Sequence, residues 1–463
     1  MIPTQASRLE HLHTDAKAIF DHALKACDIA GAFDRHLEFL GNTLVRHPSP
    51  LLKSIPVPLE KYKRVIVISL GKAGLTMLNA LLDRLPPKML YRGVCSSPEV
   101  PKKRNWRIRY FEGGHPLPNE DSFAAAREAL KLLKQARKDT FIFFLISGGG
   151  SAMMELPRDP KISLYDTIAF HETLISSGAS ITEINTIRKY FSALKGGRLA
   201  MAAPEAGKLS LLLADVPMKD LGAVASSPTL PDRSTPAECL DVLRRFHLLE
   251  KFPQSVREYF EGLHLESDPE TVSNPEENEA FANAQFDTLL SNHDFVNAAR
   301  DHAHSLGYRV IIDNTCDDWD YRDASVYLLK RFHELRRESP RFCLLSSGEV
   351  TVKIDGPAGC GGRNQQFALF SAFELAAYEH EALAVLSTGS DGIDGNSPAA
   401  GAISDPTTLR RAREYGFDPE VTLKRFDTCP LFTALGDTIV TGPTGNNLRD
   451  LRVMLAMGDT TNS

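Results

Sequence analysis

Cysteine is scarce in this 463-residue chain: there are seven, scattered along it, and no two are spaced as Cys-x-x-Cys. An odd, dispersed set offers no disulfide framework, and the missing Cys-x-x-Cys pairs argue against a zinc site. Cys360 lies in a glycine-rich loop, but no activating base is apparent near it in the sequence, so we do not expect a nucleophilic thiol. These features indicate a reducing compartment, and we expect the protein to be cytoplasmic.

Long apolar runs and long basic runs are also missing. No stretch reaches the 18 or so apolar residues of a membrane span, and Glu10, Asp15 and Asp21 interrupt any leader-like pattern near the start. The net charge is −6, and no long basic run interleaved with aromatic residues stands out, so we expect neither a membrane nor a nucleic-acid partner. The hydrophobic fraction of 43% and the charged fraction of 24% are typical of folded cores with a solvated surface.

The common phosphate and dinucleotide fingerprints are absent as well. Gly71-Lys72 is followed by alanine rather than by the Ser or Thr of a P-loop, and the protein-kinase motif set is missing. The loop from Gly359 to Asn364 lacks the last glycine of a dinucleotide fingerprint. Any phosphoryl transfer would therefore use a different architecture.

What the sequence does contain is a series of apolar strands that end in polar residues. The runs at 64–70 and 140–146 exit into Lys72 and into the loop Ser147-Gly-Gly-Gly-Ser151, and the run at 208–213 exits into Asp215. In an open parallel sheet, ligands bind outside the carboxyl ends of the strands, so these groups are expected at one edge. Three consecutive glycines favour a nest that binds an anion, although a structural turn is the alternative. A solvated lysine is the alternative for Lys72, and helix capping for Asp215.

A second alternating series follows a polar, acidic stretch, and it predicts a second domain. We expect an α/β protein with two largely parallel, doubly wound sheets, in domains spanning residues 1–265 and 280–463. A short hairpin strand is predicted at 350–354.

Two loops of this second series suit phosphate chemistry. Gly359-Cys-Gly-Gly-Arg-Asn-Gln-Gln366 carries Arg363 among glycines and amides, and the loop from Ser387 to Gly395 carries Asp391 and Asp394. Arginine matches phosphate oxygens, and paired acids suit Mg2+. Asx turns are an equally good explanation of the two Asp-Gly sequences.

Taken together, the ordered motifs resemble the glycerate 2-kinases, whose carboxyl-terminal part is called the MOFRL domain. The resemblance covers nearly the whole chain. It rests on Gly71-Lys-Ala-Gly74, Gly113-Gly-His-Pro-Leu-Pro-Asn119, Ser147-Gly-Gly-Gly-Ser-Ala152, Asn185-Thr-Ile-Arg-Lys189, Leu194-Lys-Gly-Gly-Arg-Leu-Ala200, Asp215-Val-Pro217, Ser347-Gly-Glu349, Gly361-Gly-Arg-Asn-Gln365, Ser390-Asp-Gly-Ile-Asp-Gly395 and Gly442-Pro-Thr-Gly445.

The resemblance implies a kinase that uses ATP and Mg2+ to make 2-phosphoglycerate from D-glycerate, with its active site in the cleft between two α/β domains. The residues it implies are grouped by role: catalytic, Lys72, Asp215 and Arg363; nucleotide-binding, Ser147, Gly148, Gly149, Gly150, Ser151 and Asn364; substrate-binding, Arg188, Lys195 and Arg198; Mg2+-binding, Glu349, Asp391 and Asp394. Lys72 and Arg363 would bind the transferring phosphate, and Asp215 would orient or accept the hydroxyl proton.

Some residues depart from the family pattern. Met218 and Lys219 follow the Asp215 motif, and Ser227 stands where glycine is usual, so a related hydroxy acid stays open as the substrate. A hydroxypyruvate reductase is the alternative from another reaction class, but it would need the dinucleotide fingerprint that is missing. A catalytically silent binding protein is the third interpretation.

Overall fold

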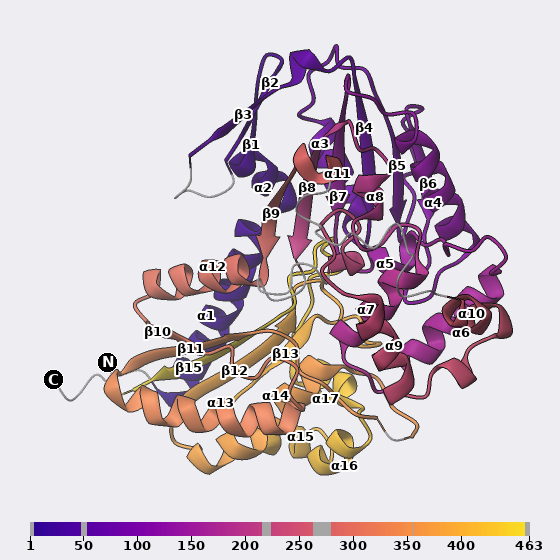
Figure 1. The fold of residues 1–463 in the computed structure, drawn as a ribbon. Helices are drawn as coiled ribbons and strands as arrows, with labels where there is room; N and C mark the ends of the chain where they lie inside the picture. Colours follow the sequence, from indigo (N-terminus) through magenta and orange to yellow (C-terminus); the bar gives the residue numbers. More distant parts are fainter. Residues whose placement is uncertain (1–3, 48–52, 215–223, 263–278, 355, 459–463) are drawn as a thin grey trace. The chain divides into compact units, whose positions relative to one another are not determined.

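The computed structural model describes residues 4–47, 53–214, 224–262, 279–354 and 356–458. The chain forms two compact units, drawn in Figure 1: residues 29–289, which we call the central unit, and residues 1–28 with 290–463, which we call the C-terminal unit. Both are α/β, which confirms the predicted fold class. Each unit is described by itself.

The central unit is built on a six-stranded sheet in the order β6-β5-β4-β7-β8-β9, and its first five strands pair in parallel. Every residue of β7 is buried, as its unbroken apolar run predicts for a strand covered on both faces. The strands are β4 (Arg64–Leu70), β5 (Tyr91–Ser97), β6 (Ile108–Glu112), β7 (Thr140–Ile146), β8 (Gly207–Ala214) and β9 (Ala284–Ser291).

Helices cover this sheet, and one of them shows why its sequence is helical. Asn119 caps α4 in a capping box with Ser122, and alanines at 125, 126 and 129 let the helix pack closely on Ile142 and Phe144. The helices of this part are α2 (Ile29–His36), α3 (Gly74–Leu82), α4 (Glu120–Leu133), α5 (Gly150–Met153), α8 (Arg198–Met201) and α11 (Glu279–Ala282). A small antiparallel sheet adds β1 (Leu37–Leu40), β2 (Thr43–Arg46) and β3 (Ile55–Pro58).

A separate helical core in the central unit carries α7, which matters for the site below. Phe170 stacks on Phe191 with ring centroids 4.0 Å apart, and both pack among buried aromatic and aliphatic residues. This core fixes the orientation of α7. Its helices are α6 (Leu164–Ile175), α7 (Ile181–Phe191), α9 (Pro236–Arg245) and α10 (Gln254–Glu261).

The C-terminal unit has a mixed sheet in the order β10-β11-β15-β12-β13-β14. β15 lies antiparallel between β11 and β12, so β10, β11 and β12 still run in one direction. The predicted hairpin strand at 350–354 does not form; only Thr351 makes a bridge, to Asp320. The strands are β10 (Arg309–Ile312), β11 (Arg341–Ser347), β12 (Ala382–Gly389), β13 (Gly401–Ser404), β14 (Thr438–Ile439) and β15 (Asp450–Met457).

Helices lie against both faces of this second sheet. α13 and α14 share a core with Leu344 and Val385, while α1 packs on β12, β15 and α12, with Phe20 edge-on to Phe295. The amino-terminal helix therefore belongs to the C-terminal unit, whereas the predicted division placed residues 1–28 in the N-terminal domain. The helices are α1 (Gln5–Ala26), α12 (Asn292–Ser305), α13 (Tyr321–Leu335), α14 (Arg363–Leu375), α15 (Thr408–Glu414), α16 (Pro419–Lys424) and α17 (Thr428–Leu435).

Candidate active site

Two loops meet at the carboxyl ends of β4 and β7. The Lys72 amide donates to the Gly148 carbonyl at 2.8 Å, and the Ala73 amide donates to Ser147 Oγ at 3.0 Å. Gly71 has a φ of +111°, and a Cβ there would collide with the Ser147 backbone, so glycine is required for this approach. Lys72 is exposed to solvent at the point where these two loops meet.

The glycine loop has the backbone form of an anion nest. Gly149 adopts a φ of +78° and caps α5. Within the described residues, the amides of Gly148, Gly149 and Ser151 donate to no other group. Successive free amides around a left-handed residue form a concave site for an anion. Ser147 itself is tied to Ala73, so its hydroxyl is structural.

Lys72, His115 and Arg188 lie together beside this nest. A Cβ on Gly149 would meet His115 Cδ2 at 2.9 Å and Lys72 Cγ at 3.2 Å. Desolvation, together with the positive charges of Lys72 and Arg188, lowers the pKa of His115 to about 4. The imidazole is therefore neutral at pH 7, and the surrounding charge is cationic.

Arg188 is a guanidinium without a carboxylate fork. It lies near the end of α7, its Nε is buried, and this atom has no hydrogen-bond partner in the described part of the chain. Desolvation lowers its pKa, and the charge of Glu155 opposes that shift. Burying a cation without a paired anion costs free energy in folding, so its presence here suits the binding of an anionic ligand.

A hydrogen-bonded row connects α7 to the nest. Ser226 Oγ donates to Asn185 Oδ1 at 2.8 Å and lies 2.7 Å from Ser151 Oγ. Ala225, Ser226 and Ser227 all have positive φ, at 49°, 58° and 56°, which is strained for residues with a side chain. Ser226 was missed by the sequence analysis, because a left-handed turn without glycine leaves no compositional signal.

Lys195 has a different place from the one predicted. It is 1% exposed and pairs with Glu155, which also accepts from Ser192 Oγ at 2.5 Å and contacts His171 Nε2 at 3.1 Å. Burial alone would raise the pKa of Glu155, but Lys195 and His171 together lower it to about 2, so this carboxyl is ionised. Lys195 is thus a buried structural cation, not an open ligand for a carboxylate.

Arg198 is likewise occupied by its own neighbourhood. Its Nη1 donates to the carbonyls of Lys189 and Lys195 at 2.6 and 2.9 Å, and the residue is 9% exposed. These bonds hold the chain that follows α7 against it. Of the three predicted substrate cations, Arg188 alone keeps the character of a ligand site.

In the C-terminal unit, Arg363 is the first residue of α14 and is held by two acids. Nε and Nη2 form a fork on Asp450 at 2.6 and 2.9 Å, and Nη2 also lies 2.9 Å from Glu349. Burial would lower the pKa of Arg363, and these carboxylates raise it well above the ordinary value. No described residue bonds to Nη1, the remaining donor nitrogen.

Asp394, predicted as a metal ligand, instead caps α14. Its two oxygens accept from the amides of Asn364 and Gln365, each at 2.9 Å, and from the Gln365 side chain at 3.0 Å. Burial raises the pKa of Asp394 to about 6 against these bonds, so it is a carboxylate at neutral pH. Asn364 is also buried and accepts from Ser387 Oγ at 2.7 Å, which leaves little of it for a nucleotide.

The other two predicted metal ligands are engaged as well. Asp391 accepts from the Ile393 amide at 3.2 Å, which is the Asx turn that was the alternative explanation, and Glu349 is paired with Arg363. Over the ranges that the structure describes, no group of three His, Cys, Asp or Glu could hold a metal ion. The third predicted catalytic residue, Asp215, lies outside the described residues, as do Met218 and Lys219.

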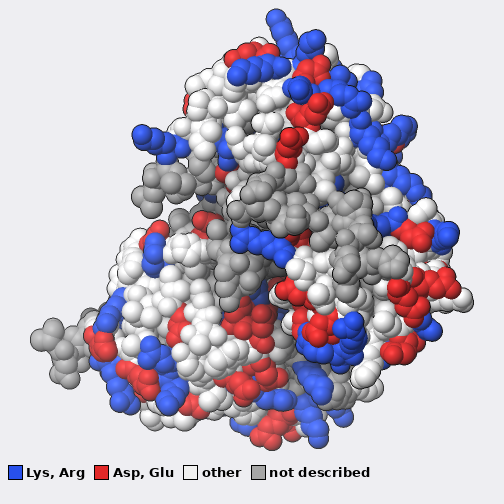
Figure 2. All heavy atoms as spheres, in the orientation of Figure 1, with Lys and Arg blue, Asp and Glu red and all other residues white. Residues whose placement is uncertain are grey.

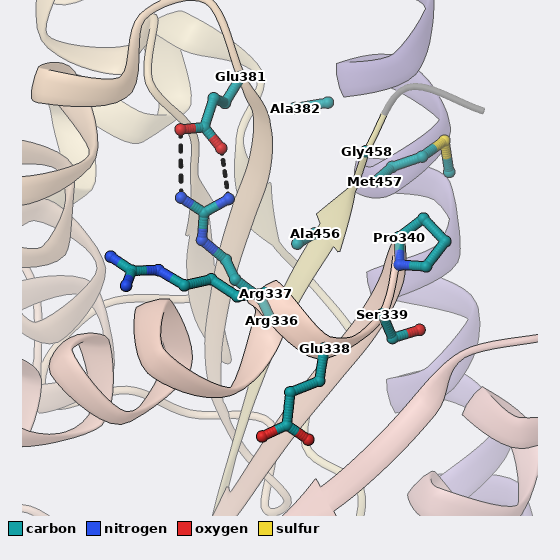
Figure 3. A pocket seen from close by; sticks show the side chains of 10 residues that line it. All are labelled: Arg336, Arg337, Glu338, Ser339, Pro340, Glu381, Ala382, Ala456, Met457 and Gly458. Carbon is teal, nitrogen blue, oxygen red and sulfur yellow. Dashed lines mark hydrogen bonds and ion pairs between the residues drawn. The ribbon is translucent and has the colours of Figure 1, made fainter. Parts of the chain in front are cut away.

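Two pockets of the C-terminal unit lie away from the predicted residues. One, of about 300 Å³, lies at the amino ends of β11 and β12, where Figure 3 shows Arg336 forked on Glu381. Another, of about 470 Å³, lies along α13 and α14. None of the predicted site residues lines either pocket.

The face drawn in Figure 2 carries charges of both signs among the described residues. On the face in Figure 2, Lys and Arg side chains are interspersed with Asp and Glu side chains, in keeping with a net charge of −6. Among the described helices, none combines the length and apolar character that crossing a bilayer requires.

Known proteins resemble this chain along most of its length. A domain family of unknown function, DUF4147, matches residues 15–261, and the MOFRL family matches residues 342–450. A glycerate 2-kinase of Pyrococcus horikoshii is 36% identical over 397 residues, which are 85% of this chain and 87% of the relative. A protein of Agrobacterium vitis, provisionally named a hydroxypyruvate reductase, is 34% identical over 401 residues, 85% of this chain and 87% of its own.

A solved structure shares the fold. The crystal structure of a glycerate kinase from Thermotoga maritima superposes with a TM-score of 0.79 at 30% identity, covering 97% of this chain and 100% of that one. Fold and sequence together define an α/β enzyme of the kinase class. The chain belongs to the glycerate 2-kinase family, as its motifs predicted.

Proposed function

We propose that the protein phosphorylates the 2-hydroxyl of D-glycerate with ATP as the phosphate donor. The observation that carries the proposal is the cationic cluster of the central unit: Arg188, a desolvated guanidinium without an acid fork, lies with Lys72 beside a nest of free backbone amides. A small carboxylate and a polyphosphate are the two kinds of anion that such a pair of sites suits.

The residues divide the work by charge. Arg188 binds the glycerate carboxylate, and the amides of Gly148, Gly149 and Ser151 bind phosphate oxygens of the nucleotide. Lys72 stabilises the negative charge on the transferring group, because phosphoryl transfer depends on alignment and electrostatic stabilisation more than on covalent help. Arg363, fixed by Asp450 and Glu349, is proposed as a second phosphate ligand through its unbonded Nη1.

Mg2+ is expected with ATP in a kinase, but the three acids predicted to hold it do not fit that task. Asp394 spends both oxygens on the start of α14, Asp391 closes an Asx turn, and Glu349 pairs with Arg363. These three carboxylates therefore have no part in the proposed reaction.

The alternative functions are less well supported. The name of the Agrobacterium vitis relative favours a hydroxypyruvate reductase, but this chain has no dinucleotide fingerprint. Another small hydroxy acid is a closer alternative, because Arg188 would bind any short carboxylate in the same way.

A coupled assay of ADP release tests the proposal. Purified protein should release ADP with D-glycerate, and Lys72→Ala should lower kcat by roughly 100-fold or more, the size expected when one preorganised donor to a developing charge is lost. Lys88→Ala, an exposed lysine of another loop, is the control. NADH oxidation with hydroxypyruvate, without ADP release from glycerate, would contradict the proposal.

A further inference from the structure

His115 lies beside the nest, and the proposed reaction has not used it. It lies in the loop after β6, and its ring and the Lys72 stem approach Gly149 so closely that a Cβ there would meet both, at 2.9 and 3.2 Å. The glycine at 149 is therefore needed for this approach as well as for its φ of +78°.

No structural role within the described residues explains the position of the His115 ring. Within the described ranges, no hydrogen bond or ion pair involves either ring nitrogen of His115. The charged groups acting on it are Lys72, from the loop after β4, and Arg188, from α7, and both are cations. A histidine between two cations gains nothing by charging, so its position favours the neutral ring.

A neutral imidazole can accept a hydrogen bond, which the two cationic side chains beside it cannot do. Lys72 and Arg188 can only donate hydrogen bonds, and the nest offers amide donors. The nearby oxygen acceptor Asn185 Oδ1 is bonded to Ser226, and Ser147 Oγ is bonded to the Ala73 amide. D-glycerate has a carboxylate that these donors can bind, and its hydroxyl also needs an acceptor; Asp215, which the family resemblance implies for that role, lies outside the described residues.

Building on the function proposed above, we propose that His115 accepts the hydrogen bond of the substrate hydroxyl that is phosphorylated, and so selects a hydroxy acid over a plain carboxylate. The hydroxyl oxygen attacks the γ-phosphorus, the bond from that phosphorus to the β,γ-bridging oxygen breaks, and its electron pair leaves with ADP. The imidazole holds the hydrogen bond of the hydroxyl so that its oxygen is aligned for attack, and the proton passes to a non-bridging oxygen of the transferred phosphoryl group as the new P–O bond forms.

Two variants separate acceptor chemistry from bulk. His115→Phe keeps a ring of similar size without an acceptor, and His115→Gln places an amide oxygen near the position of Nε2. We expect kcat/KM for D-glycerate to fall by about 100-fold in His115→Phe, the size expected when a reacting group loses its alignment, and to recover at least tenfold in His115→Gln. KM for ATP should change by less than twofold in both.

An inhibitor with a carboxylate and no hydroxyl shows where the loss arises. Propanoate should bind the wild type and His115→Phe with the same inhibition constant, whereas Arg188→Met should weaken it. If His115→Phe weakens propanoate inhibition by the same factor as it lowers kcat/KM for D-glycerate, the proposal is overturned. The ring would then shape the pocket and not bind the hydroxyl. Unchanged D-glycerate kinetics in His115→Phe would overturn it as well.

A readout independent of turnover covers the case in which the proposed function fails. In histidine-labelled protein, the NMR signal that disappears in His115→Phe should not titrate between pH 8 and 5.5, because its pKa is lowered to about 4. In Arg188→Met the midpoint should move upward, since one of the two cations is gone. A titration midpoint near 6.5 that is unchanged in Arg188→Met would overturn the proposed arrangement. A wild type whose His115 signal stays constant over this pH range, but which makes no ADP, would instead reject the kinase function.

Discussion

At the scale of single residues, the fate of each cation is decided by whether an acid lies within reach. Lys195 and Arg188 come from the same stretch of sequence and were predicted to do the same thing. Lys195 is buried against Glu155, and Arg188 is desolvated without an acid fork. The first therefore stabilises the fold, and the second is poised for a ligand.

This contrast predicts opposite outcomes for two matched substitutions. Lys195→Met leaves the Glu155 carboxylate buried and unpaired, and it should destabilise the central unit by roughly 3–5 kcal/mol. Arg188→Met removes an uncompensated charge, so stability should hold or rise, while KM for D-glycerate should increase by roughly 30-fold or more through loss of a buried charge pair. Thermal unfolding and steady-state kinetics on both variants check this. A stable Lys195→Met with a raised KM would reverse the assignment.

Some of the proposed site groups are readable from local sequence, and others have uses that only the fold decides. Lys72 and the nest at Ser147–Ser151 follow from strand exits and glycine content, which are local signals. Asp391 and Asp394 could serve a metal or a turn, and only the three-dimensional position of α14 decides for the turn and the cap. His115 stood in a quoted motif but was given no role, because the burial that mainly lowers its pKa and the nearby cations Lys72 and Arg188 are features of the fold and not of the local sequence.

At the scale of elements, the site of the central unit depends on the loop between β7 and α5. Gly149 and Gly178 have the same φ of +78°, but a Cβ on Gly178 would meet nothing within 4 Å. The two glycines therefore have equal backbone strain and different surroundings.

Alanine at these two positions should separate strain from site chemistry. Gly149→Ala and Gly178→Ala should each lose roughly 1–2 kcal/mol of stability from the left-handed conformation. Gly149→Ala should also lower kcat/KM by tenfold or more, because the added Cβ displaces His115 and Lys72 from the nest. Circular dichroism melts with the ADP assay distinguish the two effects. Similar activity losses in both variants would mean that strain alone explains them.

Strand order shows the limit of prediction at the element scale. The runs that became β4, β7 and β8 were recognised because strands buried on both faces are continuously apolar. The position of β15 between β11 and β12 was not predicted. Which strands pair depends on residues far apart in the chain, and the sequence of one strand does not show it. The α/β class was therefore predicted, while the mixed pairing of the second sheet was not.

At the scale of the whole molecule, the chain begins in the unit that it also ends in. α1 lies against α12 and the sheet of the C-terminal unit, which a linear division of the sequence could not anticipate. Its buried residues, such as Leu12, Ile19 and Phe20, form one apolar face. That pattern predicts a covered helix but not the sheet that it covers.

Phe20→Ala should therefore destabilise the C-terminal unit, although it lies near the start of the chain. We expect a loss of roughly 3–5 kcal/mol, with faster hydrogen exchange in β12 and β15 and little change in β4 and β7. Thr14→Ala, on the exposed side of the same helix, is the control. Faster exchange confined to β4 and β7 would contradict the assignment of α1.

If the enzyme places phosphate on the 2-hydroxyl of D-glycerate, as we propose, 31P NMR of the reaction product recorded without proton decoupling will show it. An ester at carbon 2 couples to one proton, so a doublet should grow as ATP is consumed. A triplet, from the two protons of carbon 3, or no ester signal at all would contradict it.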